Sequence, residues 1–266
     1  MLLHINHVSR YHYDTPVHYA LQQVRLTPKR RQGQNVIDWS VEIEGGKKEL
    51  KFEDQHSNTV DLISTEPGTQ DIAVICTGTV ELTDGSGIIG HQGGFAPLWY
   101  FQRATDLTRP GKAIRKLVSE VRRQDLFSLD QAHALSAMIH QRVAYAAGET
   151  HPRTTAEEAL NQGEGVCQDH SHIFVSAARL LGLPARYVSG YLMMNDRVDQ
   201  DATHAWAEAH IDNLGWVGFD ISNGHSPDER YVRVATGLDY KEAAPISGMR
   251  YGSGMERLSV ELQVQQ

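Results

Sequence analysis

The stretch from residue 163 to 183, which reads GEGVCQDHSHIFVSAARLLGL, constrains this chain more than any other. Two glycines come first, and apolar residues then recur at helical spacing, at Ile173, Phe174, Ala177, Leu180 and Leu181. Gly182 followed by Pro184 supplies a stop, since glycine accepts the left-handed cap conformation and proline cannot continue the helix. The pattern therefore predicts a helix that begins at or near Cys167, one of only two cysteines.

A thiol in the first turn of a helix lies against the positive end of the helix dipole and near unpaired backbone N–H groups. Both features favour the thiolate, which is the nucleophilic form of cysteine, and both can bind a developing oxyanion. A free cysteine is also commonly a small buried hydrophobic residue. Taken alone, this stretch leaves a catalytic role and a packing role for Cys167 open.

The first third of the chain has the pattern of a β domain. Short runs rich in β-branched and aromatic residues alternate with turn residues, most clearly at residues 36–43, 60–63 and 72–82. This predicts an antiparallel β-sandwich-like domain over residues 1–90. The glycine-rich run Gly85–Gly94 marks the place where the chain leaves it. That run lacks the GK[ST] ending and following helix of a phosphate-binding loop.

The remaining residues, 91–266, predict a second domain of α+β class with its core at about residues 155–225. Helical periodicity covers residues 113–121, a capping-box pattern begins at Ser128, and Thr154 or Thr155 caps a further short helix. Strand-like runs follow at residues 185–192, 203–211, 216–221 and 258–264. The polar residues 193–202 between them predict a mobile loop above the strand ends.

The strands at residues 203–211 and 216–221 carry the candidate chemistry. Alternation places one set of apolar side chains on the core face, namely Ala205, Ala207, Ala209, Ile211, Val217, Phe219 and Ile221. His204 and Asp220 then share the opposite face only if the connecting loop has an odd length, so we expect three or five residues. On neighbouring strands the Asp220 carboxylate would hold the imidazole of His204 through its Nδ1–H, which fixes the tautomer and stabilises the imidazolium.

If the Cys167 helix packs across this sheet, the chain holds a nucleophile, a base and an orienting carboxylate, in the order Cys167, His204, Asp220. The backbone N–H of Cys167 is the expected oxyanion donor. Neither Gln168, which points elsewhere on a helix, nor Asn161, six residues upstream, is assigned as a side-chain donor.

Residues 163–225 resemble the transglutaminase-like cysteine enzyme superfamily. The resemblance is carried by GVCQD at 165–169, LGLPARYVSGY at 181–191, THAWAE at 203–208 and GWVGFD at 215–220. HVSRYHYDTPV at 7–17, VRLTPKR at 24–30 and GLDYKEAAPISGMRYGSG at 237–254 resemble its bacterial branch, so the similarity covers nearly the whole chain. Two positions depart from the family pattern: His170 replaces an aromatic or apolar residue, and Ile221-Ser222-Asn223 follows Asp220 in place of Pro-Thr-Asn.

The resemblance implies a papain-like core with a triad at Cys167, His204 and Asp220. It implies thiolate attack on the carbonyl of a peptide or protein substrate, loss of ammonia or an amine, and a thioester resolved by water or by a second amine. We expect hydrolysis, as in a protease or amidase, because residues 193–202 show no means of excluding water. A cross-linking transglutaminase and a non-catalytic binding or scaffold protein on the same fold are the alternatives. The mechanism requires no cofactor.

A formal net charge of -8 and the absence of a long basic run argue against nucleic acid or an anionic membrane as the partner. The short basic cluster Lys29, Arg30 and Arg31 is expected to be a solvated loop. No stretch resembles a signal peptide or a membrane span, and two cysteines fit a reducing compartment, so a cytoplasmic protein without a structural disulfide is expected.

A metal hydrolase is the rival enzyme class, since there are 14 histidines and the run Asp169-His170-Ser171-His172. Residues two apart on a helix point in different directions, so His170 and His172 are not expected to bind one ion together. His4, His7, His12 and His18 lack ligand-type neighbours in sequence and are expected to have packing or surface roles.

Overall fold

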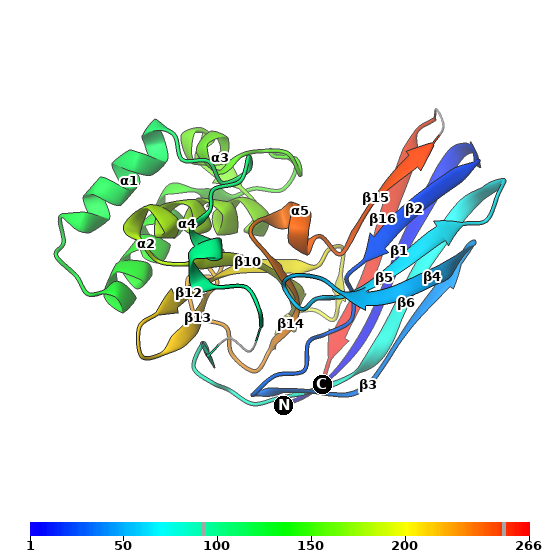
Figure 1. Ribbon diagram of the computed structural model, residues 1–266, viewed down its shortest axis with the longest axis horizontal. Coiled ribbons are helices and arrows are strands. Elements are labelled where there is room, and N and C mark those ends of the chain that lie inside the picture. Colours follow the sequence, from blue (N-terminus) through cyan, green and yellow to red (C-terminus); the bar gives the residue numbers. More distant parts are fainter. Residues whose placement is uncertain (92–93, 252–253) are drawn as a thin grey trace.

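The computed structural model describes residues 1–91, 94–251 and 254–266. It has mixed α+β architecture with antiparallel sheets, and the strands of one domain stand beside a second domain that holds the helices (Figure 1). Residues 92 and 93 of the glycine-rich run Gly85–Gly94 lie outside the described residues. None of the described helices is long and apolar enough to cross a membrane.

The β domain is built from two facing sheets. The five-stranded sheet has the order β11 (Asp199–Gln200), β16 (Glu256–Gln265), β1 (Leu2–Val17), β6 (Thr69–Leu82), β3 (Gln34–Glu44). The four-stranded sheet has the order β15 (Ile246–Tyr251), β2 (Tyr19–Val24), β5 (Thr59–Thr65), β4 (Gly46–Glu53). Alternate side chains of β1 are buried, which is the pattern of a strand with one face on a core. The predicted sandwich-like arrangement is confirmed.

The C-terminal strands of the expected second domain, residues 91–266, pair with strands of the β domain. β16 pairs antiparallel with β1, from His4 opposite Gln265 to Tyr13 opposite Glu256, and β15 pairs with β2. The chain therefore crosses back, and residues 246–265 complete both sheets of the β domain. Periodicity predicted the strand at 258–264, but it carries no information about which sheet a strand joins, because any unpaired sheet edge can accept it.

The second domain packs helices on a five-stranded antiparallel sheet. Its strand order is β14 (Tyr231–Gly237), β10 (Ala185–Leu192), β12 (His204–Ile211), β13 (Gly215–Phe219), β7 (Ile88–Gly90). The helices are η1 (Leu98–Gln102), α1 (Lys112–Arg122), α2 (Ser128–Arg142), α3 (Ala156–Gln162), α4 (Cys167–Leu181) and α5 (Tyr240–Ala243). Two short parallel strands, β8 (Ala144–Tyr145) and β9 (Glu164–Gly165), lead into α4.

The helix caps test the capping-box predictions. Thr155 caps α3, since its side chain accepts the N–H of Glu158 while the Glu158 carboxylate accepts the N–H of Thr155, as predicted. Ser128 is not a cap. It is already the first helical residue of α2, and Phe127 precedes it without a side-chain cap bond.

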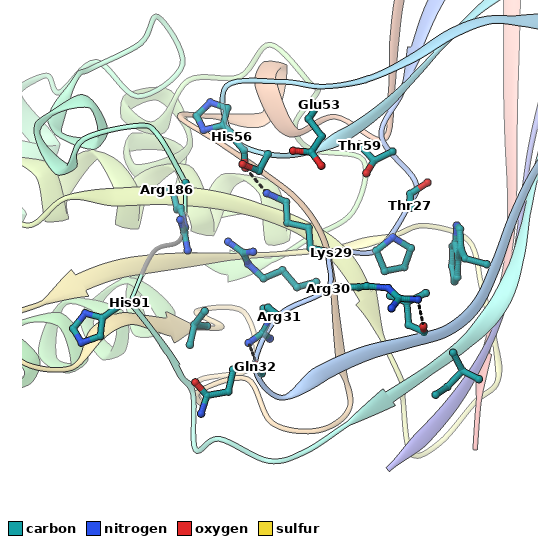
Figure 2. Close-up of a pocket in the computed structure, with 18 of the residues that line it drawn as sticks. Thr27, Lys29, Arg30, Arg31, Gln32, Glu53, His56, Thr59, His91 and Arg186 are labelled. Atoms are coloured by element: carbon teal, nitrogen blue, oxygen red, sulfur yellow. Dashed lines mark hydrogen bonds between the residues drawn. The ribbon is translucent and has the colours of Figure 1, made fainter.

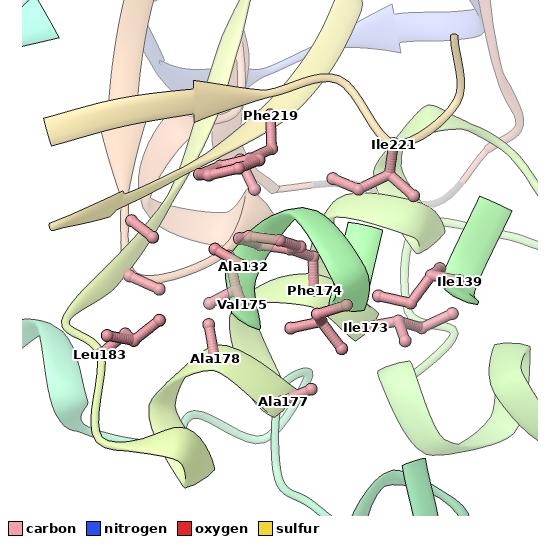
Figure 3. Close-up of a cluster of buried hydrophobic side chains, with 14 of the residues drawn as sticks. Ala132, Ile139, Ile173, Phe174, Val175, Ala177, Ala178, Leu183, Phe219 and Ile221 are labelled. Atoms are coloured by element: carbon pink, nitrogen blue, oxygen red, sulfur yellow. The ribbon is translucent and has the colours of Figure 1, made fainter. Parts of the chain in front are cut away.

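The core of the second domain holds α4 against the middle of the sheet. Ile173, Phe174 and Ala177 of α4 are fully buried with alanines of β12 and with Phe219 of β13 (Figure 3). Phe174 stacks on Phe219 with ring centroids 4.9 Å apart. The core face predicted for β12 and β13 is confirmed, and this packing fixes where the first residue of α4, Cys167, meets the sheet.

A second core is shared by the two domains. Tyr191, Val232 and Val234 from the helix-bearing domain pack with Leu3, Ile5 and other residues of the β domain. The Tyr191 hydroxyl also lies 2.9 Å from Nδ1 of the buried His7. His7 thus has the packing role that was expected of it.

The segment at residues 193–202, expected to be a mobile loop, is irregular apart from the two-residue strand β11, which contacts the β domain. Its strand β11 pairs with β16, and Gln200 donates a hydrogen bond from Nε2 to the carbonyl of Leu192 at 2.9 Å. The sequence gives no sign of β11, because a two-residue strand is too short to leave a periodic signal.

Candidate active site

Cys167 is the first residue of α4 and is half-buried, with the extended residue Val166 at the N-cap. The turn before it is held by the buried carboxylate of Asp169, whose Oδ2 accepts the N–H of Val166 at 2.9 Å and the hydroxyl of Thr150 at 2.6 Å. A Cβ at Gly165 would lie only 2.8 Å from that carboxylate. The spacing of glycine, cysteine and aspartate in GVCQD therefore builds a tight turn that presents the thiol.

His204 and Asp220 meet on one face of the sheet. Ile211 pairs with Gly215, so the connecting loop has three residues, and the predicted odd length is confirmed. The Nε2 atom of His204 lies 2.6 Å from Oδ2 of Asp220. The prediction of an Nδ1 contact is wrong, because the carboxylate approaches the far end of the ring and leaves Nδ1, nearer the backbone, for the thiol.

The electrostatics of the three groups favour a charged imidazole. Burial disfavours the imidazolium and by itself would lower the pKa of His204. The charge and hydrogen bond of the Asp220 carboxylate, and then those of Cys167, outweigh the effect of burial and raise the pKa of His204 to about 10. Burial likewise opposes ionisation of Asp220, yet its contacts with His204, Asn223 and Tyr231 lower its pKa to about 2. The structure thus brings together all three residues that the sequence singled out.

Two partners of Asp220 were missed at the sequence level. Tyr231 donates its hydroxyl to Oδ2 at 2.7 Å, and Asn223 donates its side-chain amide to the same oxygen at 2.7 Å. Asn223 could have been found, since it closes the turn three residues after Asp220. Tyr231 lies on β14, two strands away from β12, and it belongs to none of the motifs read from the sequence. Its contact with Asp220 therefore becomes visible only once the sheet order is known.

Two known family models match this chain. Residues 115–221, which include all three groups, match the transglutaminase-like superfamily, and residues 3–81 match the bacterial transglutaminase-like N-terminal region. These two regions of the chain are transglutaminase-like. The resemblance stated from its motifs is confirmed, and so is the α+β fold class.

Individual relatives match all or part of this transglutaminase-like chain. It is 26% identical to an uncharacterized protein of Mycobacterium leprae, over 98% of each chain. It is 37% identical to an uncharacterized protein of Mycobacterium bovis over 127 residues, which are 44% of this chain and 40% of that protein. A crystal structure of a "putative cysteine protease" from Cytophaga hutchinsonii shares the fold, with a TM-score of 0.75, 20% identity and coverage of 100% and 98% of the two chains.

The two departures from the transglutaminase-like pattern contact each other. Nδ1 of His170 lies 2.7 Å from Oγ of Ser222, and its Nε2 lies 3.0 Å from the carbonyl of Val143. Burial lowers the pKa of His170, so the ring is neutral. His170 therefore links the Cys167 helix to the loop that follows Asp220.

The second histidine of this helix has a separate environment. Nε2 of His172 accepts the N–H of Tyr240 at 3.1 Å, and burial lowers its pKa to about 3. The two histidines thus have different partners, as the helical geometry predicted. Within residues 1–91, 94–251 and 254–266, no group of three or more His, Cys, Asp or Glu side chains is arranged to hold a metal ion.

The side chains near the thiol narrow the choice of oxyanion donor. Gln168 donates to the carbonyl of Pro152 at 3.3 Å and Asn161 to that of Glu157 at 2.8 Å, so neither is directed at Cys167.

Tyr145, which sequence reasoning missed, does lie near the thiol. Burial, and then the charges of Cys167 and Asp220, raise its pKa. Pairing of β8 with β9 brings it there.

Proposed function

We propose that this transglutaminase-like protein is a thiol-dependent acyltransferase acting on peptide or carboxamide bonds, with Cys167 as nucleophile, His204 as base and acid, and Asp220 as the positioning carboxylate. The observation that carries the proposal is the buried Asp220–His204 contact at 2.6 Å beside a thiol at a helix start. A hydrogen-bonded imidazole next to a cysteine is the arrangement that activates a thiol for acyl transfer.

In the proposed reaction the thiolate attacks the carbonyl carbon, so a C–S bond forms and the carbonyl electron pair moves to oxygen. The N–H groups at the start of α4 bind that oxyanion. As the intermediate collapses, the C–N bond breaks and the leaving amine takes a proton from the His204 imidazolium. Water then gives a proton to the neutral His204 and attacks the thioester. The C–S bond breaks, a carboxylic acid leaves, and the Cys167 thiolate and His204 imidazolium are restored. Hydrolysis is preferred to amine transfer, in line with the name given to the Cytophaga hutchinsonii protein of the same fold.

The test is incubation with a peptide library, with and without a primary amine, followed by mass spectrometry of the products. We expect hydrolysed peptides in both samples, loss of product in Cys167→Ala, and retention in Cys76→Ala, whose thiol is buried in the β domain. Products that persist in Cys167→Ala would refute the proposed nucleophile. A predominance of amine-linked products would instead identify a transferase.

A further inference from the structure

A cavity of about 700 Å³ lies where the β domain meets the sheet of the transglutaminase-like domain (Figure 2). Residues 27–32, between β2 and β3, form one wall, and Arg186 of β10 and Arg233 of β14 form another. Cys167, His204 and Asp220 do not line it. The cavity is therefore a different place from the proposed catalytic site.

Of the basic cluster expected to be a solvated loop, Arg30 is exposed, whereas Lys29 and Arg31 are partly buried. Lys29 donates from Nζ to the carbonyl of His56 at 2.6 Å and to the hydroxyl of Thr236 at 3.0 Å. The Gln34 amide donates to the carbonyls of Lys29 and Arg233, at 2.6 and 2.8 Å. These bonds fix the segment against β14, so its cations are held in place before any ligand arrives.

Positive charge exceeds negative charge around the cavity. Arg186 on β10 and Arg233 on β14 both donate hydrogen bonds to the buried carboxylate of Glu208 on β12, the strand next to β10. Lys29 and Arg31 add two cations. The Nε–H of Arg31 is enclosed and has no acceptor among the described atoms.

The other carboxylates do not offset this excess. Asp38 and Glu53 line the cavity but are exposed to solvent. Asp54, which also acts on Lys29, is bonded to Arg25 at 3.3 Å. The one buried carboxylate that both Arg186 and Arg233 contact is thus Glu208, which does not itself line the cavity.

The lowered pKa values of Lys29 and Arg31 reflect burial and the same excess of positive charge. Burial, and then repulsion from Arg233 and Arg186, holds the pKa of Lys29 well below its usual value. Burial, and then repulsion from Arg233, lowers the pKa of Arg31 to about 10. A bound anion would relieve this repulsion, since charges interact more strongly in a partly buried site than in water.

We propose that this cavity, which we call the inter-domain site, binds a small molecule bearing phosphate or carboxylate groups, held by Lys29, Arg31 and Arg233. Guanidinium groups present paired donors that match either kind of oxyanion. The volume is within the range of roughly 300–1,000 Å³ typical of small-molecule sites. The proposal is independent of the proposed acyl transfer.

The test is calorimetric titration of the full chain with inorganic phosphate, pyrophosphate and citrate at constant ionic strength. We expect saturable one-to-one binding of at least one probe, weakened about tenfold or more in Arg31→Gln because a charge-assisted hydrogen bond is lost. Arg115→Gln, an exposed arginine on α1 outside the cavity, should bind as the wild type does. Preference for pyrophosphate or for citrate would show which oxyanion the site selects.

Two further variants separate a loss of binding from misfolding and from failure of the catalytic proposal. Arg31→Lys keeps the charge and should bind more tightly than Arg31→Gln, and it replaces Arg31→Gln if that variant fails to fold. Cys167→Ala should bind as the wild type does, so failure of the catalytic proposal would not affect this result. Absence of saturable binding by all three probes, or equal binding by Arg31→Gln and Arg115→Gln, would overturn the inter-domain site.

Discussion

At the scale of single residues, Asp220 is the acceptor that connects the side chains of the candidate site. It accepts from the imidazole of His204, the amide of Asn223 and the hydroxyl of Tyr231. The sequence could predict the first contact, because alternation and an odd loop place both residues on one face. It could not predict which ring nitrogen is used or that Tyr231 approaches from β14, since both depend on how the strands are ordered and twisted.

The His204–Asp220 pair makes stability depend on pH. The pKa of His204 is raised to about 10 from an ordinary 6.5, so the protonated ring stabilises the fold fully below about pH 6.5 and loses that effect as the pH rises toward 10. The pKa of Asp220 is lowered to about 2 from 3.8, so its contribution is present above about pH 4 and lost as the pH falls toward 2. The difference in unfolding temperature between wild type and His204→Gln, followed by circular dichroism, should be largest between about pH 4 and 6.5. A difference that grows from pH 7 to 10 would contradict this.

Removing one donor from Asp220 should be measurable. Tyr231→Phe deletes a hydrogen bond to a buried carboxylate, and we expect the free energy of unfolding to fall by about 1.5–3 kcal/mol. Urea denaturation is the measurement. The matched control is Tyr251→Phe, because that side chain is 75% exposed and should change stability by less than about 0.5 kcal/mol. Equal effects in the two variants would show that the Tyr231 contact contributes nothing.

At the scale of elements, the start of α4 depends on a glycine and an aspartate four residues apart. The sequence predicted this start from its glycines, its apolar spacing and its stop at Gly182. It gave no sign that Asp169 folds back onto Val166, because that bond depends on the side-chain rotamer and on Thr150 from a distant loop. Gly165 is required here by the close approach of the carboxylate rather than by a left-handed backbone.

This close approach can be tested by a double-mutant cycle. Gly165→Ala places a Cβ 2.8 Å from the Asp169 carboxylate, so we expect a loss of about 1–3 kcal/mol in the free energy of unfolding. In an Asp169→Gly background both the carboxylate and the Cβ of residue 169, which would also lie 2.8 Å away, are absent, and the same substitution should cost much less. Urea denaturation of the four proteins gives the coupling. Additive losses would refute the proposed contact.

At the scale of the whole molecule, the two domains are joined by the shared core and by the return of the chain into the β domain. Local periodicity predicted most of the strands, but not that β15 and β16 belong to the first domain or that Lys29 and Arg31 face the second. Both features come from contacts between residues more than a hundred positions apart. The fold class and the three site residues were accessible from sequence because their signals are local.

The shared core predicts that the domains unfold together. Leu262 on β16 is 1% exposed within that core, so Leu262→Ala should cost about 2–5 kcal/mol in the free energy of unfolding. Leu258→Ala, on the same strand but 53% exposed, is the matched control and should have little effect. Far-ultraviolet circular dichroism and tryptophan fluorescence should report one coincident urea transition in both variants. Two separated transitions would show that the domains are independent.

The central claim is that the imidazole of His204 activates the thiol of Cys167, and the rate of alkylation by iodoacetamide at neutral pH tests it most directly. Peptide mass spectrometry separates Cys167 from Cys76, whose pKa is raised to about 12 by burial and which serves as the internal control. We predict fast labelling of Cys167 alone, slowed about tenfold or more in His204→Ala. An unchanged rate in His204→Ala would contradict the account.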